Sequence, residues 1–119
     1  MAADPKYGHV ANRILSRIED EEQAVTSTFV IAQVLAFLKW KRKLSVIPAF
    51  VEFLQSLPNL TKIDTLFTDS VEMKRMQNAS WKMWDDLVIA SQMRRLNISE
   101  IYSNDSDFDS VGGIERVFE

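Results

Sequence analysis

The side chains best suited to chemistry are aspartates, which occur in two groups in the second half of the chain. Asp85 and Asp86 lie in the opening turns of an expected helix, where the positive end of the helix dipole stabilises a carboxylate. Asp105 and Asp107 directly follow an expected strand. Each group alone has an ordinary explanation, as an acidic helix start or as an Asp-rich turn whose side chains bond the local backbone.

Together, the two groups indicate a second explanation, a site for a hard divalent cation. Carboxylates that meet at one place repel each other unless a cation joins them. The matching ion is Mg²⁺ or Mn²⁺, which prefers oxygen ligands. Such an ion can lower the pKa of a bound water and stabilise the charge that develops on a phosphate during hydrolysis.

The composition excludes several other chemistries. None of the 119 residues is cysteine, which excludes disulfides, thiolate zinc sites and a cysteine nucleophile. His9 is the single histidine, so histidine metal clusters are excluded and a Ser-His-Asp triad would need His9 as its base. The net charge of -3 gives no basic field over the whole surface of the kind that binds nucleic acid unaided. Carboxylates therefore remain to carry any chemistry.

No signal for export or for membrane insertion is found in the sequence. Residues 1–6 lack the apolar core of a signal peptide. No segment approaches the roughly 18 consecutive apolar residues that a membrane span needs. We therefore expect a cytoplasmic protein without a membrane partner.

Helices and short strands are expected to alternate along the chain. The spacing of apolar residues predicts helices at about 7–19, 28–43, 46–57, 68–77 and 80–95, and strands at 24–26, 60–63 and 101–103. Ser27 or Thr28 is the expected N-cap of the second helix, and Asn97 the expected stop of the last. Residues 111–118 are left unassigned. Strands separated by helices predict an α/β fold in which helices cover a parallel sheet, formed by residues 1–119 as one domain.

Three segments carry a resemblance to a known family. Residues 85–90 (Asp-Asp-Leu-Val-Ile-Ala), 101–108 (Ile-Tyr-Ser-Asn-Asp-Ser-Asp-Phe) and 112–114 (Gly-Gly-Ile) resemble the C-terminal signature of PIN domains. Many PIN domains are the VapC-like toxin ribonucleases of toxin–antitoxin pairs. In the family, an Asp opens a helix that reads Asp-x-x-Ile-Ala or similar, and a strand ends in Thr/Ser-x-Asp-x-Asp-Phe. The resemblance implies a PIN-like three-layer sandwich with a central parallel sheet, and metal-dependent cleavage of single-stranded RNA.

The resemblance also implies an acidic pocket drawn from four places in the chain. Asp85 is carried over as the third acid and Asp105 as the fourth, both as ligands of Mg²⁺ or Mn²⁺, with Asp107 in support through a water. Gln33 falls at the second acidic position, at the edge of the pocket, where it offers a carbonyl oxygen but no negative charge. The first acid ends the family's first strand, which is expected to be missing from this chain.

The missing strand is central in the family's sheet, so its absence would leave backbone groups unpaired on both sides. A start codon assigned too late, a truncated and decaying member, or a strand donated by a partner would each explain it. Two functions stay open: a metal-dependent endoribonuclease with an incomplete acidic site, or a catalytically inactive PIN fold that binds RNA or a protein. Gln33 favours the inactive fold, whereas Asp85 and Asp105 favour the enzyme.

Partners and surface residues have more than one interpretation. RNA is the implied substrate. An antitoxin protein and a second copy of the chain are candidate partners. An exposed apolar set including Phe50, Phe53 and Phe67 would be compatible with a dimer. Trp81 and Trp84 could stack on RNA bases or pack in a core or interface. The cations at the end of the second helix could meet RNA phosphates or form a solvated helix end; they are Lys39, Lys41, Arg42 and Lys43.

Overall fold

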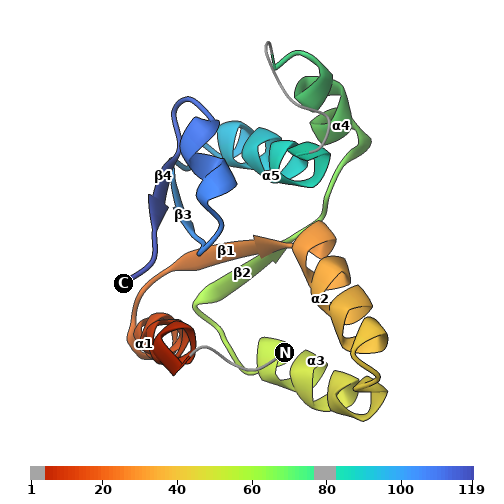
Figure 1. The fold of residues 1–119 in the computed structure, drawn as a ribbon, viewed down its shortest axis with the longest axis vertical. Coiled ribbons are helices and arrows are strands. Elements are labelled where there is room, and N and C mark those ends of the chain that lie inside the picture. Colours follow the sequence, from red (N-terminus) through yellow and green to blue (C-terminus); the bar gives the residue numbers. More distant parts are fainter. Residues whose placement is uncertain (1–4, 77–82) are drawn as a thin grey trace. The chain divides into compact units, whose positions relative to one another are not determined.

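Helices and strands alternate in the computed structural model, which describes residues 5–76 and 83–119 (Figure 1). In chain order the elements are α1 (Pro5–Asp20), β1 (Ala24–Ser27), α2 (Thr28–Trp40), the 3₁₀ turn η1 (Leu44–Val46), α3 (Ile47–Gln55), β2 (Leu60–Ile63), α4 (Phe67–Lys74), α5 (Trp84–Arg95), β3 (Glu100–Tyr102), the 3₁₀ turn η3 (Ser106–Ser110) and β4 (Glu115–Val117). The five predicted helices and three predicted strands are present, with ends shifted by a few residues. Residues 80–82 of the last predicted helix lie outside the described residues.

The strands form two separate two-stranded sheets, and both are parallel. β1 pairs with β2 in the register Ala24 to Leu60, and β3 pairs with β4 in the register Glu100 to Glu115. The α/β class with parallel strands is therefore confirmed. Within residues 5–76 and 83–119 no strand belongs to both sheets, so the described strands form two parallel pairs and not the single central sheet that the sequence predicted. β4 lies in the segment that the sequence left unassigned.

The chain folds as two compact units, one formed by Leu15–Asp64 and the other by Met1–Ile14 with Thr65–Glu119. In the first unit, the crossover from β1 to β2 runs through α2, η1 and α3. Ser27 caps α2, since its hydroxyl oxygen accepts a hydrogen bond from the Val30 N–H at 3.3 Å. This confirms the predicted cap, and it joins the end of β1 directly to the start of α2.

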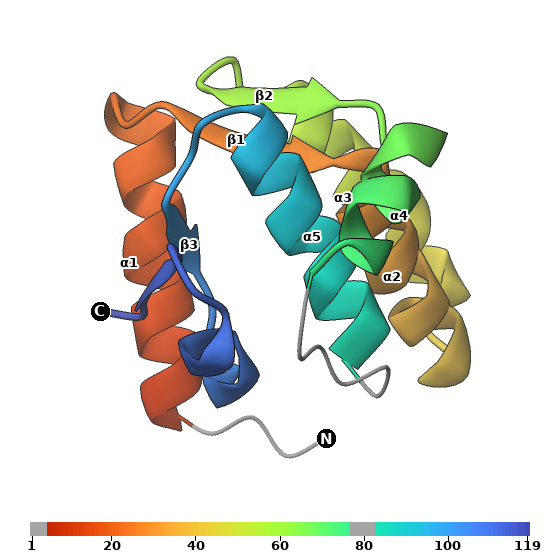
Figure 2. The same ribbon diagram turned by 90° about the horizontal axis from the view of Figure 1, so that it is seen from above.

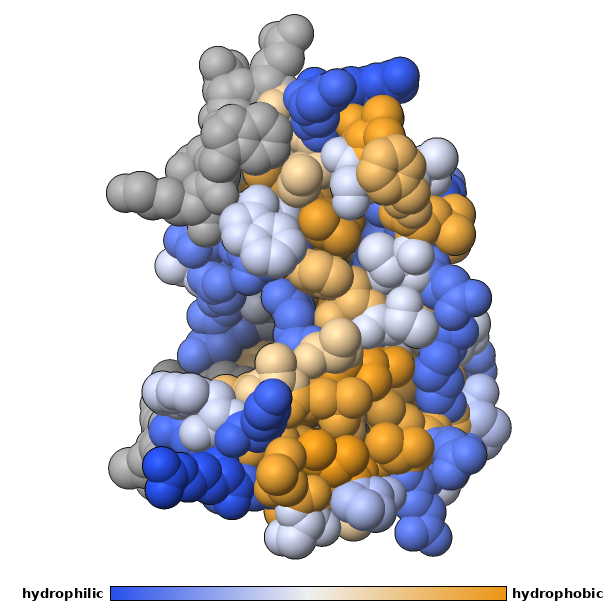
Figure 3. Space-filling view, turned by 90° about the vertical axis from the view of Figure 1, so that its right-hand side faces the viewer, coloured by the Kyte–Doolittle hydropathy of each residue, from blue (hydrophilic) through white to orange (hydrophobic). Residues whose placement is uncertain are grey.

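Both crossover helices are apolar yet poorly covered. No residue of α2 or α3 is buried, although each helix is rich in Phe, Val, Leu and Ile. Figure 3 shows the result as a continuous apolar patch over α2 and α3, bordered by hydrophilic side chains. Exposed large apolar side chains on these two helices include Phe37 and Val51. Such a surface is typical of a contact site for a partner.

The second unit has a buried centre on α5. Leu87, Ala90 and Val111 form its core cluster, and Met73 and Ile114 pack against it with further partly buried side chains. α4 lies beside α5 in both ribbon views (Figures 1 and 2). α5 therefore contributes most of the buried core of this unit.

A charged pair joins these two helices. The Arg95 guanidinium on α5 donates to the carboxylate of Asp69 on α4 at 2.8 Å. α5 then ends where the sequence predicted, because Asn97 adopts a left-handed φ of 58° and the Ile98 N–H donates to the Met93 carbonyl at 2.8 Å. Among the helices in the described part of the chain, none is long and apolar enough to cross a membrane.

Candidate metal centre

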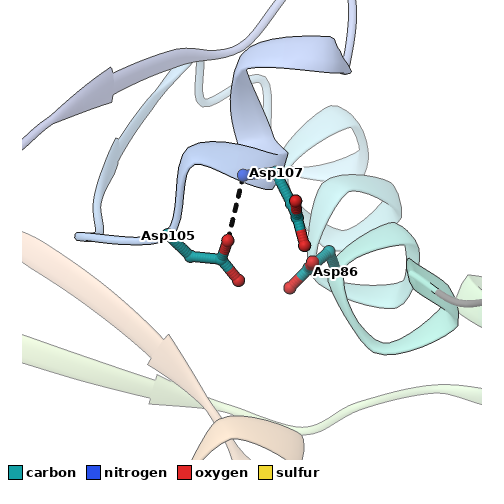
Figure 4. Close-up of side chains that lie close together, drawn as sticks. All are labelled: Asp86, Asp105 and Asp107. Carbon is teal, nitrogen blue, oxygen red and sulfur yellow. Dashed lines mark hydrogen bonds between the residues drawn. The ribbon is translucent and has the colours of Figure 1, made fainter.

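Three carboxylates converge in the second unit. Asp86, Asp105 and Asp107 each offer an oxygen atom, and these oxygens lie within 4.8 Å of one another. Asp86 comes from the first turn of α5, whereas Asp105 and Asp107 come from the start of η3 (Figure 4). Asp86 is only 8% exposed, and the other two are exposed. The cluster therefore has one buried member and an open side.

The turn that carries two of these carboxylates is built by its own polar groups. The Asp105 N–H donates to the Ser103 hydroxyl oxygen at 3.0 Å, and the Asp105 carboxylate accepts from the Asp107 N–H at 2.9 Å. Ser110 closes the turn by donating from its hydroxyl to the Asp107 carbonyl at 2.8 Å. Phe108 is only 3% exposed, so its buried side chain anchors the turn. The Asp-rich turn expected from the sequence is present, and it directs both carboxylates toward Asp86 (Figure 4).

An arginine on β4 ties this turn to the sheet. Arg116 donates through Nε and Nη2 to the two carboxylate oxygens of Asp109, at 3.0 and 3.1 Å. A forked pair of this kind fixes direction as well as distance. The hydrogen bond from Arg116 lowers the pKa of Asp109. We call this pair the η3 clamp.

Negative charge accumulates around Asp86. Burial raises the pKa of Asp86 to about 6, and the charges of Asp85, Asp105 and Asp107 add to that increase. In physical terms, the fold holds several like charges together with part of their hydration removed. A divalent cation between them would remove this penalty.

The donor set fits Mg²⁺ or Mn²⁺. All three candidate ligands are carboxylate oxygens, the type that hard cations prefer. Around an octahedral Mg²⁺, neighbouring ligand oxygens are about 2.9 Å apart and opposite ones about 4.2 Å. Oxygens that already lie within 4.8 Å of one another therefore need only small side-chain movements to share one ion.

The structure brings together two of the predicted site residues and adds a third. Asp105 and Asp107 are in the cluster, and Asp86 supplies the helix carboxylate there. Asp85, predicted as a ligand, is the preceding residue and acts on Asp86 through its charge. The motif Asp-x-x-Ile-Ala contained the signal for Asp86, because aligning it on Ile89 and Ala90 places its Asp at position 86.

Gln33, Trp81 and Trp84 are not members of the carboxylate cluster. Gln33 is a half-buried residue of α2 in the first unit, and its place at the edge of the pocket stays a prediction. Trp81 lies outside the described residues, and Trp84 is the exposed first residue of α5.

Comparisons with known proteins agree with this fold. Residues 3–114 match the sequence profile of the PIN domain. The crystal structure of Mycobacterium tuberculosis VapC20, a toxin that cleaves the sarcin-ricin loop, is similar with a TM-score of 0.72 and 18% sequence identity, over 94% of this chain and 85% of that one. No curated protein matches the chain in sequence. Because the profile match spans most of the chain, the chain belongs to the PIN domain family.

Proposed function

We propose that this protein is a Mg²⁺- or Mn²⁺-dependent endoribonuclease that hydrolyses phosphodiester bonds in single-stranded RNA. The observation that carries the proposal is the convergence of Asp86, Asp105 and Asp107 on one small region. Family membership supports it, because VapC-like PIN domains are ribonucleases. The fold of VapC20, whose described activity is cleavage of the sarcin-ricin loop, supports it as well.

In this proposal the carboxylates have separate roles. Asp86 and Asp105 hold the ion directly, and Asp107 assists through a bound water. Asp85 strengthens the site through its negative charge, which already acts on Asp86. When bound, the ion supplies a Lewis acid for the phosphate and lowers the pKa of a coordinated water. The buried position of Asp86 keeps one ligand fixed while the open side at Asp105 and Asp107 admits the RNA backbone.

Toxicity and an antitoxin partner belong to the same proposal. A PIN ribonuclease of the VapC type acts as a toxin that a cognate antitoxin protein neutralises. The apolar patch over α2 and α3 (Figure 3) leaves side chains such as Phe37 and Val51 exposed for a protein partner. A second copy of this chain is the alternative partner. Of the aromatic residues considered for a dimer, Phe67 is 82% exposed, whereas Phe50 and Phe53 are half-buried.

The second candidate function is a catalytically inactive PIN fold that binds RNA or a protein. Gln33 favours it, because the family resemblance places an acid at this position and glutamine carries no charge. The substitution Gln33→Glu separates the candidates. Cleavage should increase if the position contributes to the metal site, and it should not change if the position has another role.

A cleavage assay with single-stranded RNA tests the main proposal. We expect cleavage with Mg²⁺ or Mn²⁺, none in EDTA, and loss of cleavage in Asp86→Asn. Glu72→Gln is a matched control, because Glu72 is a carboxylate on α4 outside the cluster, and it should cleave like wild type. Metal-dependent cleavage that survives Asp86→Asn and Asp105→Asn would refute the site. RNA binding without cleavage under any of these ions would favour the inactive fold.

A further inference from the structure

A second surface of the molecule combines exposed aromatic and basic side chains. It lies in the first unit, where α2 ends and η1 begins, and we call it the α2–η1 corner. It consists of Phe37, Lys39, Trp40, Lys41, Arg42, Lys43 and Leu44. Trp40 is 73% exposed, and Phe37 and Leu44 are also exposed. The centre of the Trp40 ring lies 6.2 Å from that of the Phe37 ring, and most of the indole remains open to solvent.

The charge of the corner is entirely positive. Four of the five residues from 39 to 43 are Lys or Arg, and no Asp or Glu occurs between residues 23 and 51. Within the described residues, none of these four cations forms an ion pair with a carboxylate. Lys41 lies with its Nζ 4.5 Å from the centre of the Trp40 ring. The chain as a whole is acidic, so this concentration of unpaired cations is local.

The geometry of the helix end does not account for all four charges. Arg42 adopts a left-handed φ of 58°, and the next N–H, of Lys43, donates to the Leu38 carbonyl at 2.8 Å. Glycine fits this position with the least strain, because a side chain there crowds the backbone. The helix dipole explains cations in the last turn, but it does not explain an arginine at the strained position. The geometry of the helix end therefore gives no local reason for a cation at position 42.

We infer that the α2–η1 corner binds single-stranded RNA, with bases stacked on Trp40 and phosphates held by the surrounding cations. Exposed aromatic rings beside cations are the usual components of single-strand binding surfaces, since stacking tolerates any base and the cations follow the backbone. The flat exposed indole favours a stacked base over an acidic peptide. The choice of RNA among single-stranded nucleic acids rests on the proposed function.

Binding is tested in EDTA, where metal-dependent cleavage cannot occur, with a fluorescein-labelled 12-nucleotide oligouridylate followed by fluorescence anisotropy. Trp40→Ala should raise Kd about tenfold. The double variant Lys39→Gln/Lys43→Gln should weaken binding and reduce the slope of log Kd against log salt by about 1.4. Two matched controls should bind like wild type: Phe67→Ala, which removes an exposed aromatic residue, and Lys74→Gln/Arg75→Gln, which removes two exposed cations on and beside α4.

Arg42→Gly separates RNA binding from folding. Glycine relieves the left-handed backbone at this position, so the unfolding temperature should stay the same or rise while Kd increases. A merely structural arginine would leave Kd unchanged in this variant. Wild-type affinity in Arg42→Gly, Trp40→Ala and the double lysine variant would overturn the inference. Binding of polyglutamate in place of the oligonucleotide, with the same dependence on these residues, would overturn it in favour of an acidic protein partner.

The same variants distinguish this inference from the proposed function. If the corner binds RNA and the cleavage proposal fails, the oligonucleotide binds in EDTA with the predicted losses but is not cut in Mg²⁺ or Mn²⁺. If the cleavage proposal holds and the corner does not bind RNA, cleavage is lost in Asp86→Asn while the corner variants keep wild-type Kd and wild-type cleavage.

Discussion

Asp86 is a buried carboxylate that the fold keeps close to other negative charges. Its pKa is about 6 in the folded chain, against an ordinary value of 3.8. Because the pKa is higher in the folded chain, the unfolded chain loses this proton at a lower pH than the folded chain does. Ionisation of Asp86 therefore favours unfolding. In the absence of a metal, the contribution of Asp86 to the free energy of unfolding should therefore decrease as pH rises from about 4 to about 6, and stay constant above that.

The substitution Asp86→Asn tests whether the charge of Asp86 destabilises the folded chain. In EDTA at pH 7.5 it should raise the free energy of unfolding by about 1–3 kcal/mol, and the difference from wild type should disappear near pH 4. Urea denaturation at a series of pH values measures both effects. A variant that is less stable than wild type at pH 7.5 in EDTA would contradict the electrostatic description of the cluster.

Asp69 shows the opposite behaviour, because its charge is paired. Burial alone would raise its pKa, but the hydrogen bond from Arg95, together with the Leu66 N–H at 2.9 Å, lowers it. The carboxylate is only 2% exposed and joins α4 to α5. Its stabilising contribution should be present above about pH 4 and lost as pH falls through the lowered pKa.

Replacing Asp69 should therefore be costly. Asp69→Ala should lower the free energy of unfolding at pH 7 by about 3 kcal/mol, because it leaves the Arg95 charge without its partner and α4 without its N-terminal acceptor. Glu72→Ala removes the carboxylate of an exposed ion pair with Arg75, three residues along the chain. This variant should cost at most about 0.5 kcal/mol. Equal losses in the two variants by chemical denaturation would show that the Asp69 pair has no special role.

At the residue scale, the sequence predicted a cluster of carboxylates, but the residue named from the start of α5 was Asp85, whereas Asp86 is in the cluster. Asp105 and Asp107 could be identified because a turn directly after a strand restricts where their side chains lie. Asp85 and Asp86 are neighbours of the same type, and the spacing to Ile89 and Ala90 in the Asp-x-x-Ile-Ala motif is the sequence signal that distinguishes them. The ion pair between Asp69 and Arg95 had no sequence signal, because it joins positions 26 residues apart.

At the scale of elements, η3 decides the shape of the metal centre. This short turn carries Asp105 and Asp107, and the η3 clamp between Asp109 and Arg116 fastens it to β4. Groups that orient metal ligands without touching the ion commonly change metal affinity by 10–100-fold. The clamp is therefore expected to act as a positioning element.

Variants on the two sides of the clamp separate positioning from charge. If the clamp positions η3, both Asp109→Asn and Arg116→Gln should weaken Mn²⁺ binding about tenfold, measured by isothermal titration calorimetry. If only charge mattered, Arg116→Gln would strengthen binding of the cation and Asp109→Asn would weaken it. Arg75→Gln, which breaks the exposed pair on α4, is the control and should leave the affinity unchanged. Changes of opposite sign would rule out the positioning role.

Elements with a strong apolar period or a clear cap could be predicted from the sequence. Ser27 and Asn97 marked helix ends correctly because each has a local physical reason, a side-chain acceptor in one case and a tolerated left-handed φ in the other. β4 was not predicted, because Glu115–Val117 is three residues long and contains two charged side chains. Its partner β3, not its own sequence, makes it a strand.

At the scale of the whole molecule, apolar burial is uneven along the chain. Seven of the twelve residues of α5 are buried, whereas no residue of α2 or α3 is. Segments with few buried contacts open more often than segments at the centre of a core. The backbone amides of α2 and α3 should therefore exchange with solvent deuterium at least about tenfold faster than those of α5.

Hydrogen–deuterium exchange with mass spectrometry measures this contrast in the isolated chain. A partner that covers the apolar patch over α2 and α3 should slow exchange there. Equal protection of α2, α3 and α5 in the isolated chain would contradict the distribution of buried residues.

The parallel α/β class could be predicted because gaps of about thirty residues between the strand candidates fit crossovers better than hairpins. The division of the strands into two pairs, and of the chain into two compact units, depends on long-range pairing. The residues of Ala24–Ser27 or of Glu100–Tyr102 alone do not indicate which strand each segment pairs with.

Direct titration with Mn²⁺ at pH 7.5, by isothermal titration calorimetry, tests the central claim that Asp86 and Asp105 together hold a divalent ion. The wild-type chain should bind one Mn²⁺, and Asp86→Asn and Asp105→Asn should each weaken binding more than about tenfold. Asp85→Asn should weaken it less, because Asp85 is outside the cluster and acts on Asp86 through its charge. Glu72→Gln should bind like wild type. Unchanged Mn²⁺ affinity in both Asp86→Asn and Asp105→Asn would contradict the claim.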